Sequence, residues 1–474
     1  MSVSPMRHVL EFWKPVRASV DLEHLARYAS PSSPPVPGIQ VVRTESPERR
    51  YRVVCAEGDF LLFAAVAPMD GVPDGAEPLA EVRDLDGTPV SWVLWYPAER
   101  CAVIPFDPDA AVEAFWYERY MPPSKKTVLS APVLSAYYAV RPLIPKRLKM
   151  LLRKIVARKT TAENHLLAWP TDRSLDLLLR LLLRVLLTAS GQERMGFLWF
   201  WPEGHPWVAV LTHDVETADG LSRVEHVMGL EAPLGLRSSF NFVPRDYDAD
   251  EALLGRMGEA GFEVGVHGYT HDGLMFSSRP TFLSRAAAVN EVARRWHASG
   301  FRSPATYRNL DWLDRLEFEY DSSVTDTAPF EPQPGGCASL YPYLVGEMVE
   351  LQMTLAQDHT LFGLLGQTDP RTWLEKLACI RECNGMACIL THPDAAPGYI
   401  GLPHNEAHYR EVLGVIAGSD AWTPLPRELA RWWKARAGAD TARADCLAGA
   451  SVGHAEIDSA GRLVIVPPLP PARR

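Results

Sequence analysis

Two histidines lie four positions apart at the end of an apolar run, in the stretch EVGVHGYTHDG at residues 263–273. Gly268 lies between His267 and His271, and its permissive backbone would let both imidazoles point toward one spot. Neutral imidazole is a common metal ligand, so the pair could bind a divalent ion. Two surface histidines on a turn would give the same pattern. The pair alone favours neither interpretation, and the rest of a metal site has to come from elsewhere in the chain.

Polar side chains follow two further apolar runs in the second half of the chain. The run LTHDVE contains Asp214 and Glu216, and the run ILTHPD contains His392. Two histidines and one carboxylate form a common ligand set for a catalytic ion that leaves positions open for water and substrate. A second carboxylate beside that set could act as a base, and a third histidine could act as an acid. The residues needed for metal-assisted hydrolysis are therefore present.

Strand-like and helical segments alternate from about residue 207 onward, and these elements must position the polar residues. One amphipathic helix is expected at 281–300, with Gly300 as its stop signal. Such alternation predicts a mainly parallel sheet or a barrel, in which active sites lie at the carboxyl ends of the strands. The expected strands are 207–215, 236–243, 262–268, 320–325, 349–355 and 386–392.

The order of these motifs resembles the polysaccharide deacetylase family, the NodB-homology domain of the carbohydrate esterase family 4 type, over about residues 205–435. THDVE is similar to the first motif, in the form with the two acids one residue apart, and His267 and His271 match the His-x-x-x-His motif. Arg302 with Pro304 matches the third motif loosely, and Leu390 with His392 matches the fifth. The resemblance implies an α/β fold with a distorted (β/α) barrel.

The same resemblance implies roles for individual residues. The metal ligands would be Glu216, His267 and His271, and the catalytic residues would be Asp214 as base, His392 as acid and Arg302 as the group that orients the base. Alternate residues of a strand share a face, so both acids of THDVE could reach the metal. The longer glutamate side chain leaves open that the two acids exchange roles. The ion would be zinc, with cobalt, iron and manganese as alternatives.

The activity implied is hydrolysis of a non-peptide carbon–nitrogen bond, removing an acetyl or similar acyl group from an N-acetylated sugar or glycan precursor. Aromatic walls for a sugar ring could come from Trp312 and Tyr307. Two alternatives remain. One is an amidohydrolase of a small non-sugar amide, which would use the same metal chemistry. The other is a catalytically retired binding subunit of polysaccharide assembly, favoured by the large N-terminal half and opposed by the complete ligand set.

Four other polar residues near these motifs have a structural interpretation and a functional one. We expect His213 to pack beside its strand or to orient a neighbour. Asp358 could cap a helix or contact substrate, and Asp321 could begin a turn or belong to the site. Asp394 is close in sequence to His392 and could be its charged partner.

Composition shifts suggest four regions along the chain. Residues 1–105 form an N-terminal β-rich region and residues 106–200 are mostly helical, so an α+β region precedes the barrel of residues 201–436. Residues 437–474 form a tail with a hairpin at 454–466. The Leu-rich segment 174–190 carries an aspartate and two arginines, so we expect a buried helix and not a membrane span.

The bulk composition limits the partners and the compartment. The 474 residues are 47% hydrophobic and 22% charged with a net charge of -10, which argues against a nucleic-acid partner. Seven scattered cysteines and the lack of an apolar signal core near the N-terminus lead us to expect a cytoplasmic protein. The basic amphipathic segment 144–159 could pack on the protein core, or contact a membrane peripherally or an anionic precursor.

Overall fold

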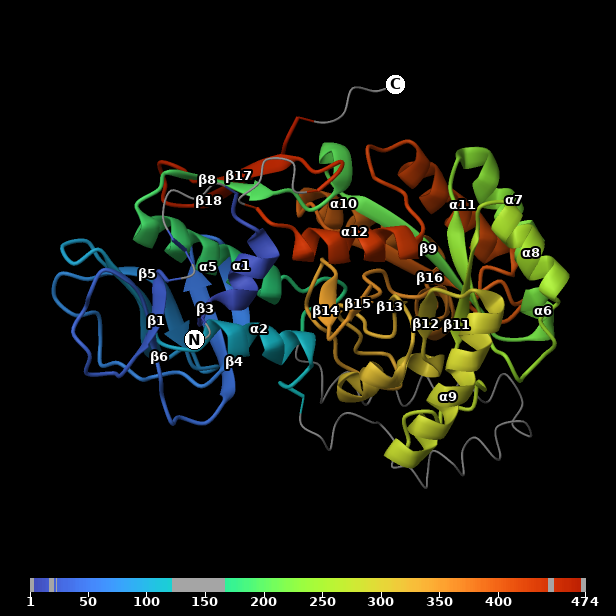
Figure 1. The fold of residues 1–474 in the computed structure, drawn as a ribbon, viewed down its shortest axis with the longest axis horizontal. Helices are drawn as coiled ribbons and strands as arrows, with labels where there is room; N and C mark the ends of the chain where they lie inside the picture. Colours follow the sequence, from blue (N-terminus) through green and yellow to red (C-terminus); the bar gives the residue numbers. More distant parts are fainter. Residues whose placement is uncertain (1–3, 17–20, 23, 122–166, 442–446, 470–474) are drawn as a thin grey trace. The chain divides into compact units, whose positions relative to one another are not determined.

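The computed structural model describes residues 4–16, 21–22, 24–121, 167–441 and 447–469 (Figure 1). Its contacts divide the chain into two compact units. Unit 1 comprises Met1–Tyr120, Arg173–Gly204 and Ala435–Arg474, and unit 2 comprises Met121–Asp172 and His205–Lys434. These units do not follow the four ranges expected from the sequence, because residues 173–204 and 435–474 group with the N-terminal residues. The basic segment 144–159 lies outside the described residues.

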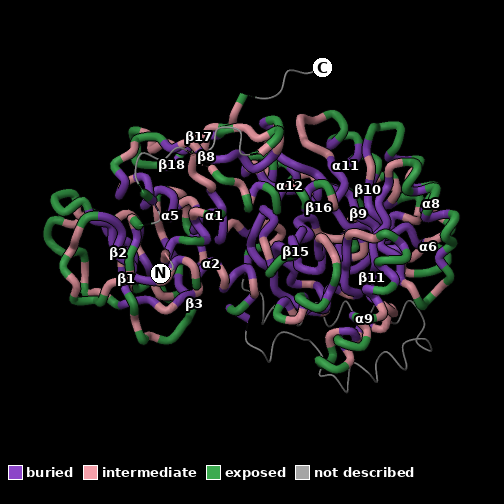
Figure 2. Tube along the Cα trace, viewed as in Figure 1, coloured by how far each residue is buried: buried purple, intermediate pink, exposed green. Residues whose placement is uncertain are grey.

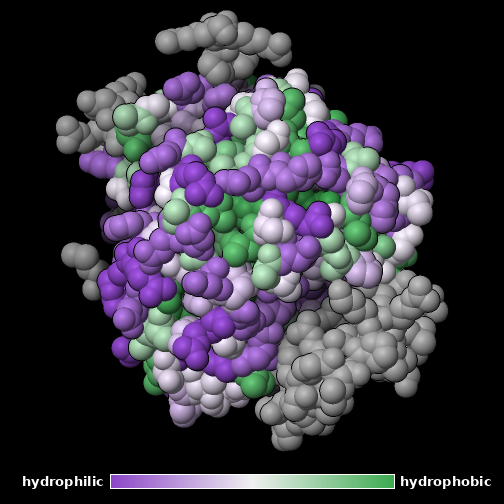
Figure 3. All heavy atoms as spheres, turned by 90° about the vertical axis from the view of Figure 1, so that its right-hand side faces the viewer, coloured by the Kyte–Doolittle hydropathy of each residue, from purple (hydrophilic) through white to green (hydrophobic). Residues whose placement is uncertain are grey.

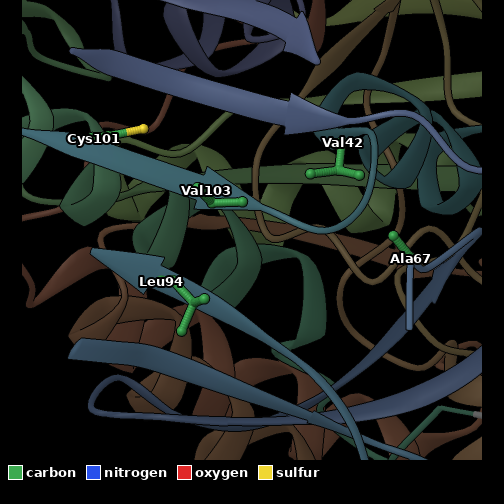
Figure 4. Packing of buried hydrophobic residues seen from close by; sticks show 5 residues of the cluster. All are labelled: Val42, Ala67, Leu94, Cys101 and Val103. Atoms are coloured by element: carbon green, nitrogen blue, oxygen red, sulfur yellow. The ribbon is translucent and has the colours of Figure 1, made fainter. Parts of the chain in front are cut away.

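Unit 1 contains a seven-stranded sheet. From one edge to the other its strands are β1 (Ala26–Ala29), β2 (Gly38–Val42), β7 (Cys101–Ile104), β6 (Pro89–Tyr96), β5 (Glu77–Arg83), β3 (Arg49–Cys55) and β4 (Gly58–Ala64). Strands β1, β2 and β7 are parallel and the other pairs are antiparallel. A small apolar cluster of this sheet is shown in Figure 4 and consists of Val42, Ala67, Leu94, Cys101 and Val103.

Three helices accompany this sheet: α1 (Arg7–Trp13), α2 (Pro108–Trp116) and α5 (Ser174–Ser190). The Leu-rich α5 contacts strands β2, β4 and β7 and is buried along almost its whole length. Its Arg184 pairs with Glu57 at 2.7 Å, so the charge inside the helix is neutralised within the unit. The expected buried helix is confirmed. In the part of the chain that the structure describes, no helix is long and apolar enough to cross a bilayer.

A second, three-stranded sheet of unit 1 joins distant parts of the sequence. Strand β17 (Val452–Ile457) lies between β18 (Leu463–Val466) and β8 (Arg194–Leu198), and both pairings are antiparallel. Strands β17 and β18 form a hairpin where the sequence suggested one.

Unit 2 is built on an eight-stranded sheet. In spatial order the strands are β14 (Tyr343–Val345), β15 (Met348–Glu350), β13 (Tyr320–Asp321), β12 (Gly300–Arg302), β11 (Glu263–His267), β10 (Ser238–Phe242), β9 (Val208–Val215) and β16 (Met386–Thr391). All neighbours are parallel except β14 and β15. The α/β class is therefore confirmed, whereas closure of the sheet into a complete barrel stays a prediction.

Helices connect the strands of unit 2 and lie outside the sheet (Figures 1 and 2). In the described part of unit 2 the α-helices are α6 (Ala218–Leu221), α7 (Val224–Glu231), α8 (Glu251–Glu259), α9 (Arg279–Trp296), α10 (Arg371–Glu382), α11 (Pro403–Ala417) and α12 (Pro426–Gly438), and the last residues of α12 belong to unit 1. Short 3-10 segments are η3 (Pro202–Gly204) in unit 1 and, in unit 2, η4 (Ala232–Leu234), η5 (Pro304–Thr306) and η6 (Leu310–Arg315), and η7 (His359–Leu364) is a π-helix. Every residue of β9 is buried, as expected for a parallel strand covered on both faces.

Two details of unit 2 correct the sequence-based expectations. Helix α9 ends at Trp296, and His297 takes the left-handed cap conformation with φ 53°, so Gly300 is not the stop. Gly300 instead begins β12, where an added Cβ would lie 2.0 Å from the ring of Tyr320. Strands β13 and β15 are also shorter than the ranges 320–325 and 349–355, although Thr325 and Met353 still form an isolated bridge.

Candidate active site

The predicted site residues meet at the carboxyl ends of neighbouring strands of unit 2. Asp214 of β9 is in register with Asn241 of β10, and His267 of β11 is in register with Arg302 of β12. On the other side of β9, His392 directly follows β16. Figure 3 views the molecule from the side on which α6, the helix after β9, lies. Hydrophobic residues gather near the middle of that face and hydrophilic residues surround them.

Three side chains of this region form a candidate metal site. Donor atoms of Glu216, His267 and His271 all lie within 4.8 Å of one another. His271 Nε2 is 2.9 Å from Glu216 Oε1, and the two imidazole centroids are 5.2 Å apart. His267 Nδ1 lies 3.2 Å from the carbonyl oxygen of Arg302, so Nδ1 carries the proton and Nε2 keeps its lone pair. This donor set fits a divalent ion.

The protonation states of two of these side chains also suit a ligand role. Burial lowers the pKa of His267 to about 4, so its imidazole is neutral at physiological pH. Burial would raise the pKa of Glu216, but the histidines around it, His271 first, hold that pKa well below its usual value. A neutral imidazole and an ionised carboxylate are the forms that bind metal.

The turn between the two histidines is fixed by close packing. Gly268 has φ +65°, and an added Cβ there would lie 2.5 Å from Cδ of Pro304. The backbone N–H of His271 donates to Asp246 Oδ2 at 2.9 Å. Glycine is therefore required at this position for the two imidazoles to converge.

Asp214 is held beside the candidate metal site by two donors. Its Oδ1 accepts hydrogen bonds from Arg302 Nη1 at 3.1 Å and from Asn241 Nδ2 at 2.8 Å. Its Oδ2 is 3.6 Å from His267 Nδ1. Burial would raise the pKa of Asp214, but two cations outweigh burial and lower the pKa: His267, which is protonated only at acid pH, and Arg302, which is charged at every pH. The lowered pKa means that the carboxylate is ionised, with Oδ1 fixed by two hydrogen bonds and Oδ2 near the imidazole of His267.

Arg302 is itself immobilised, which fixes the direction of its bond to Asp214. Its side chain is 1% exposed and donates from Nε to the Ser322 carbonyl oxygen at 2.8 Å and from Nη2 to Ser322 Oγ at 2.7 Å. Nη1 also donates to Thr212 Oγ1 at 2.9 Å. A guanidinium with this many partners presents its remaining N–H in one direction only.

His392 is paired with Asp358 and not with Asp394. His392 Nδ1 donates to Asp358 Oδ1 at 2.7 Å, and the backbone N–H of His392 donates to Oδ2 at 2.9 Å. Burial would lower the pKa of His392, but the Asp358 carboxylate outweighs burial and raises it to about 9. Asp394 accepts from the backbone N–H of Glu216 at 3.2 Å and from the Thr217 hydroxyl. His392 Nε2 lies 3.9 Å from Glu216 Oε1, at the edge of the candidate metal site.

Two residues of this arrangement, Asn241 and Tyr399, are absent from the sequence-based prediction. The Tyr399 hydroxyl donates to Glu216 Oε2 at 2.8 Å, and its ring stacks on His392 with centroids 4.2 Å apart and planes at 14°. No motif or spacing in the sequence identifies Tyr399 as a site residue. Asn241 had a weak signal, because it is the polar position inside the apolar run FNFV of a buried strand.

The remaining candidates are not members of the donor set. His213 points to the other face of β9, where it is fully buried and its Nε2 lies 2.7 Å from Glu231 Oε1. Asp321 is buried beside Glu350 and accepts from Ser323 Oγ at 2.6 Å. Trp312 packs against Phe276 at 6.3 Å between centroids.

Comparison with known proteins finds similarity among solved structures only. No protein-family model and no curated protein matches the sequence. About half of the chain is similar to solved polysaccharide deacetylases of carbohydrate esterase family 4. A protein from Mycobacterium smegmatis assigned as a polysaccharide deacetylase is 19% identical, with a TM-score of 0.40, over 50% of this chain and 93% of its own.

Two further solved structures show similar coverage. Puue allantoinase is 14% identical with a TM-score of 0.39, over 49% of this chain and 92% of its own. A family 4 acetyl xylan esterase from Clostridium thermocellum, solved with a cobalt ion, is 16% identical with a TM-score of 0.32, over 48% of this chain and 91% of its own.

Proposed function

We propose that unit 2 is a metal-dependent hydrolase that removes an acetyl group from the amide of an N-acetylated sugar or glycan precursor. The observation that supports this most directly is one cluster at the strand ends. It combines three metal-binding side chains with an ionised carboxylate and a protonated imidazole, held by Arg302 and Asp358 respectively. Hydrolysis of an amide needs a base for water and an acid for the departing nitrogen, and this cluster contains both.

Glu216, His267 and His271 would hold the ion, with zinc as our first choice and cobalt, iron or manganese as alternatives. When bound, such an ion supplies Lewis acidity, which makes water acidic enough to attack at neutral pH and polarises an acyl carbonyl. The alternative assignment, with Asp214 as ligand, is less favourable because the donor atoms that lie within 4.8 Å of one another are those of Glu216, His267 and His271.

Asp214 acts as the general base in this proposal. Its ionised Oδ2 can take a proton from the attacking water, while Arg302 and Asn241 keep Oδ1 from rotating into that position. His392 acts as the general acid, because its raised pKa keeps Nε2 protonated at neutral pH. Nδ1 is bound to Asp358, so Nε2 is the nitrogen that donates a proton to the leaving amine.

Two aromatic rings of unit 2 are the candidates we propose for contact with a sugar ring. Trp312 is half-buried and its ring is nearly parallel to that of Phe276, with planes at 16°. Partly exposed aromatic faces of this kind suit the apolar face of a sugar ring. An amidohydrolase of a small amide would need no such surface, so the two alternatives differ in the substrates they accept.

The first test is the metal content of the protein purified without added metal or chelator, beside the double variant His267→Ala/His271→Ala. We expect a divalent ion in the wild type and its loss in the double variant. Asp214→Asn should keep the ion and lose activity on a panel of N-acetylated sugars and small amides. A wild-type protein that contains no metal and takes up none on titration would refute the proposal.

A further inference from the structure

Tyr399 contacts both Glu216, a proposed metal ligand, and His392, the proposed general acid. Its hydroxyl donates to Oε2 of Glu216 at 2.8 Å, and its ring lies flat on the imidazole of His392. The side chain is buried, with an exposed fraction of 8%. A tyrosine in this position bridges a proposed metal ligand and the proposed acid.

The hydroxyl fixes the orientation of the Glu216 carboxylate. Because Oε2 is bound to the phenol, rotation of the carboxylate would break that hydrogen bond. Oε1 is therefore presented toward His271 Nε2, 2.9 Å away. Outer partners of this kind orient metal-ligating carboxylates and increase metal affinity.

The ring restrains His392 on one face, while Asp358 holds its Nδ1. Stacking at 4.2 Å between centroids with planes at 14° leaves little freedom for the imidazole to turn. With both restraints in place, Nε2 stays 3.9 Å from Glu216 Oε1.

Tyr399 is rigid enough for such a role, because its segment is anchored on both sides. Asn405 Nδ2 donates to the Tyr399 carbonyl oxygen at 2.9 Å, and the backbone N–H of Ile400 donates to Asp358 Oδ2 at 3.0 Å. Gly398, with φ +94°, packs so closely on the π-helix η7 that an added Cβ would lie 2.6 Å from the backbone nitrogen of Gly363.

From this geometry we infer that Tyr399 is a positioning residue that aligns Glu216 through its hydroxyl and His392 through its ring. The inference rests on the proposed function, since it assigns Tyr399 a role toward the ion that Glu216 would hold.

Tyr399→Phe tests the hydroxyl while leaving the ring in place. Tyr409→Phe is a matched control, because the Tyr409 hydroxyl donates to a buried carboxylate, Glu231 Oε1, at 2.7 Å in the same unit but away from the donor set. Zinc affinity is measured by competition with a chelator, and ligand geometry by the visible absorption spectrum of the cobalt(II)-loaded protein. We expect Tyr399→Phe to lose roughly 10- to 100-fold in zinc affinity and to change the cobalt spectrum. We expect Tyr409→Phe to change neither.

The outcomes separate the inference from the function on which it rests. A folded Tyr399→Phe protein with wild-type zinc affinity and cobalt spectrum overturns the inference and leaves the proposed function intact. A wild-type protein that takes up neither zinc nor cobalt overturns both. If Tyr399→Phe does not fold, Asn405→Ala decides by the same comparison, because it frees the Tyr399 carbonyl oxygen without removing hydroxyl or ring.

Discussion

Glu263, the first residue of β11, provides a quantitative test of the electrostatics of unit 2. Its side chain is fully buried, where Tyr320 OH donates to Oε1 at 2.8 Å and the backbone N–H of Arg427 donates to Oε2 at 3.1 Å. Burial outweighs both hydrogen bonds and raises the pKa of Glu263 from 4.5 to about 7. Strand β11 ends in His267, so the same strand carries a carboxyl with a raised pKa at one end and a proposed site residue at the other.

The sign of the effect follows from proton binding. Between pH 4.5 and 7 the folded protein keeps the Glu263 proton and the unfolded chain has lost it, so stability falls as pH rises through this range. The shift amounts to about 3 kcal/mol above pH 7. Most of this loss of stability, about 2–3 kcal/mol, falls between pH 5 and pH 8.

Glu263→Gln should remove this penalty, because glutamine is a neutral isostere of the protonated acid. Its amide oxygen can accept from the Arg427 N–H, and its NH2 group can donate to the Tyr320 oxygen. We expect the variant to be more stable than wild type by about 2–3 kcal/mol at pH 8, and to differ by less than about 1 kcal/mol at pH 5.

The measurement is urea unfolding at pH 5 and pH 8, with hydrogen exchange of β11 peptides to identify the transition of unit 2. Glu259→Gln is the control, because Glu259 lies exposed at the end of α8 in the same unit. A stability difference for Glu263→Gln that is the same at both pH values would refute the reasoning.

Three further perturbations address the site itself. Asp358→Asn removes the charge that holds the pKa of His392 at about 9, so the alkaline limb of kcat/KM should move down by at least about one pH unit; an unmoved limb would exclude His392 as the acid. Arg302→Met leaves the buried Asp214 carboxylate without its cation and should cost about 3–5 kcal/mol in unfolding free energy, whereas a loss below about 1 kcal/mol would show that Asp214 is not ionised. Gly268→Ala should reduce zinc affinity, measured by chelator competition, because the new Cβ would collide with Pro304. Unchanged zinc affinity would show that close packing does not fix this turn.

The parts of the fold that the sequence could predict are those with long apolar runs. Strands β9 and β16 fall inside the expected ranges 207–215 and 386–392, because buried parallel strands read as continuous apolar segments. The short strands β12 and β14 were not predicted, because three residues are too few to show a periodic pattern. Beyond β13, Ser322 Oγ donates to the Leu351 carbonyl oxygen, so side-chain bonding continues where the regular ladder has ended.

Some residues of the candidate site could likewise be predicted from the sequence and others could not. The donor atoms of His267, His271 and Glu216 lie within 4.8 Å of one another, because each residue lies on or soon after a strand whose end is fixed by the sheet; their role as metal ligands stays a prediction. The partner of His392 could not be deduced, because Asp358 is 34 positions away along the chain and Asp394 is only two. Tyr399 lies in a loop whose path depends on the π-helix and on close glycine contacts, which no local pattern encodes.

The discontinuity of unit 1 has a consequence for the order in which the chain becomes structured during synthesis. Strand β17 is the middle strand of the sheet that contains β8, yet more than 250 residues separate the two in the sequence. Residues 205–434 emerge from the ribosome before β17 and β18 are synthesised. Unit 2 can therefore complete its sheet while unit 1 still lacks these two strands. Until then β8 exposes an edge that another chain could pair with. Stalled or C-terminally shortened chains should therefore aggregate through unit 1 even where unit 2 has folded.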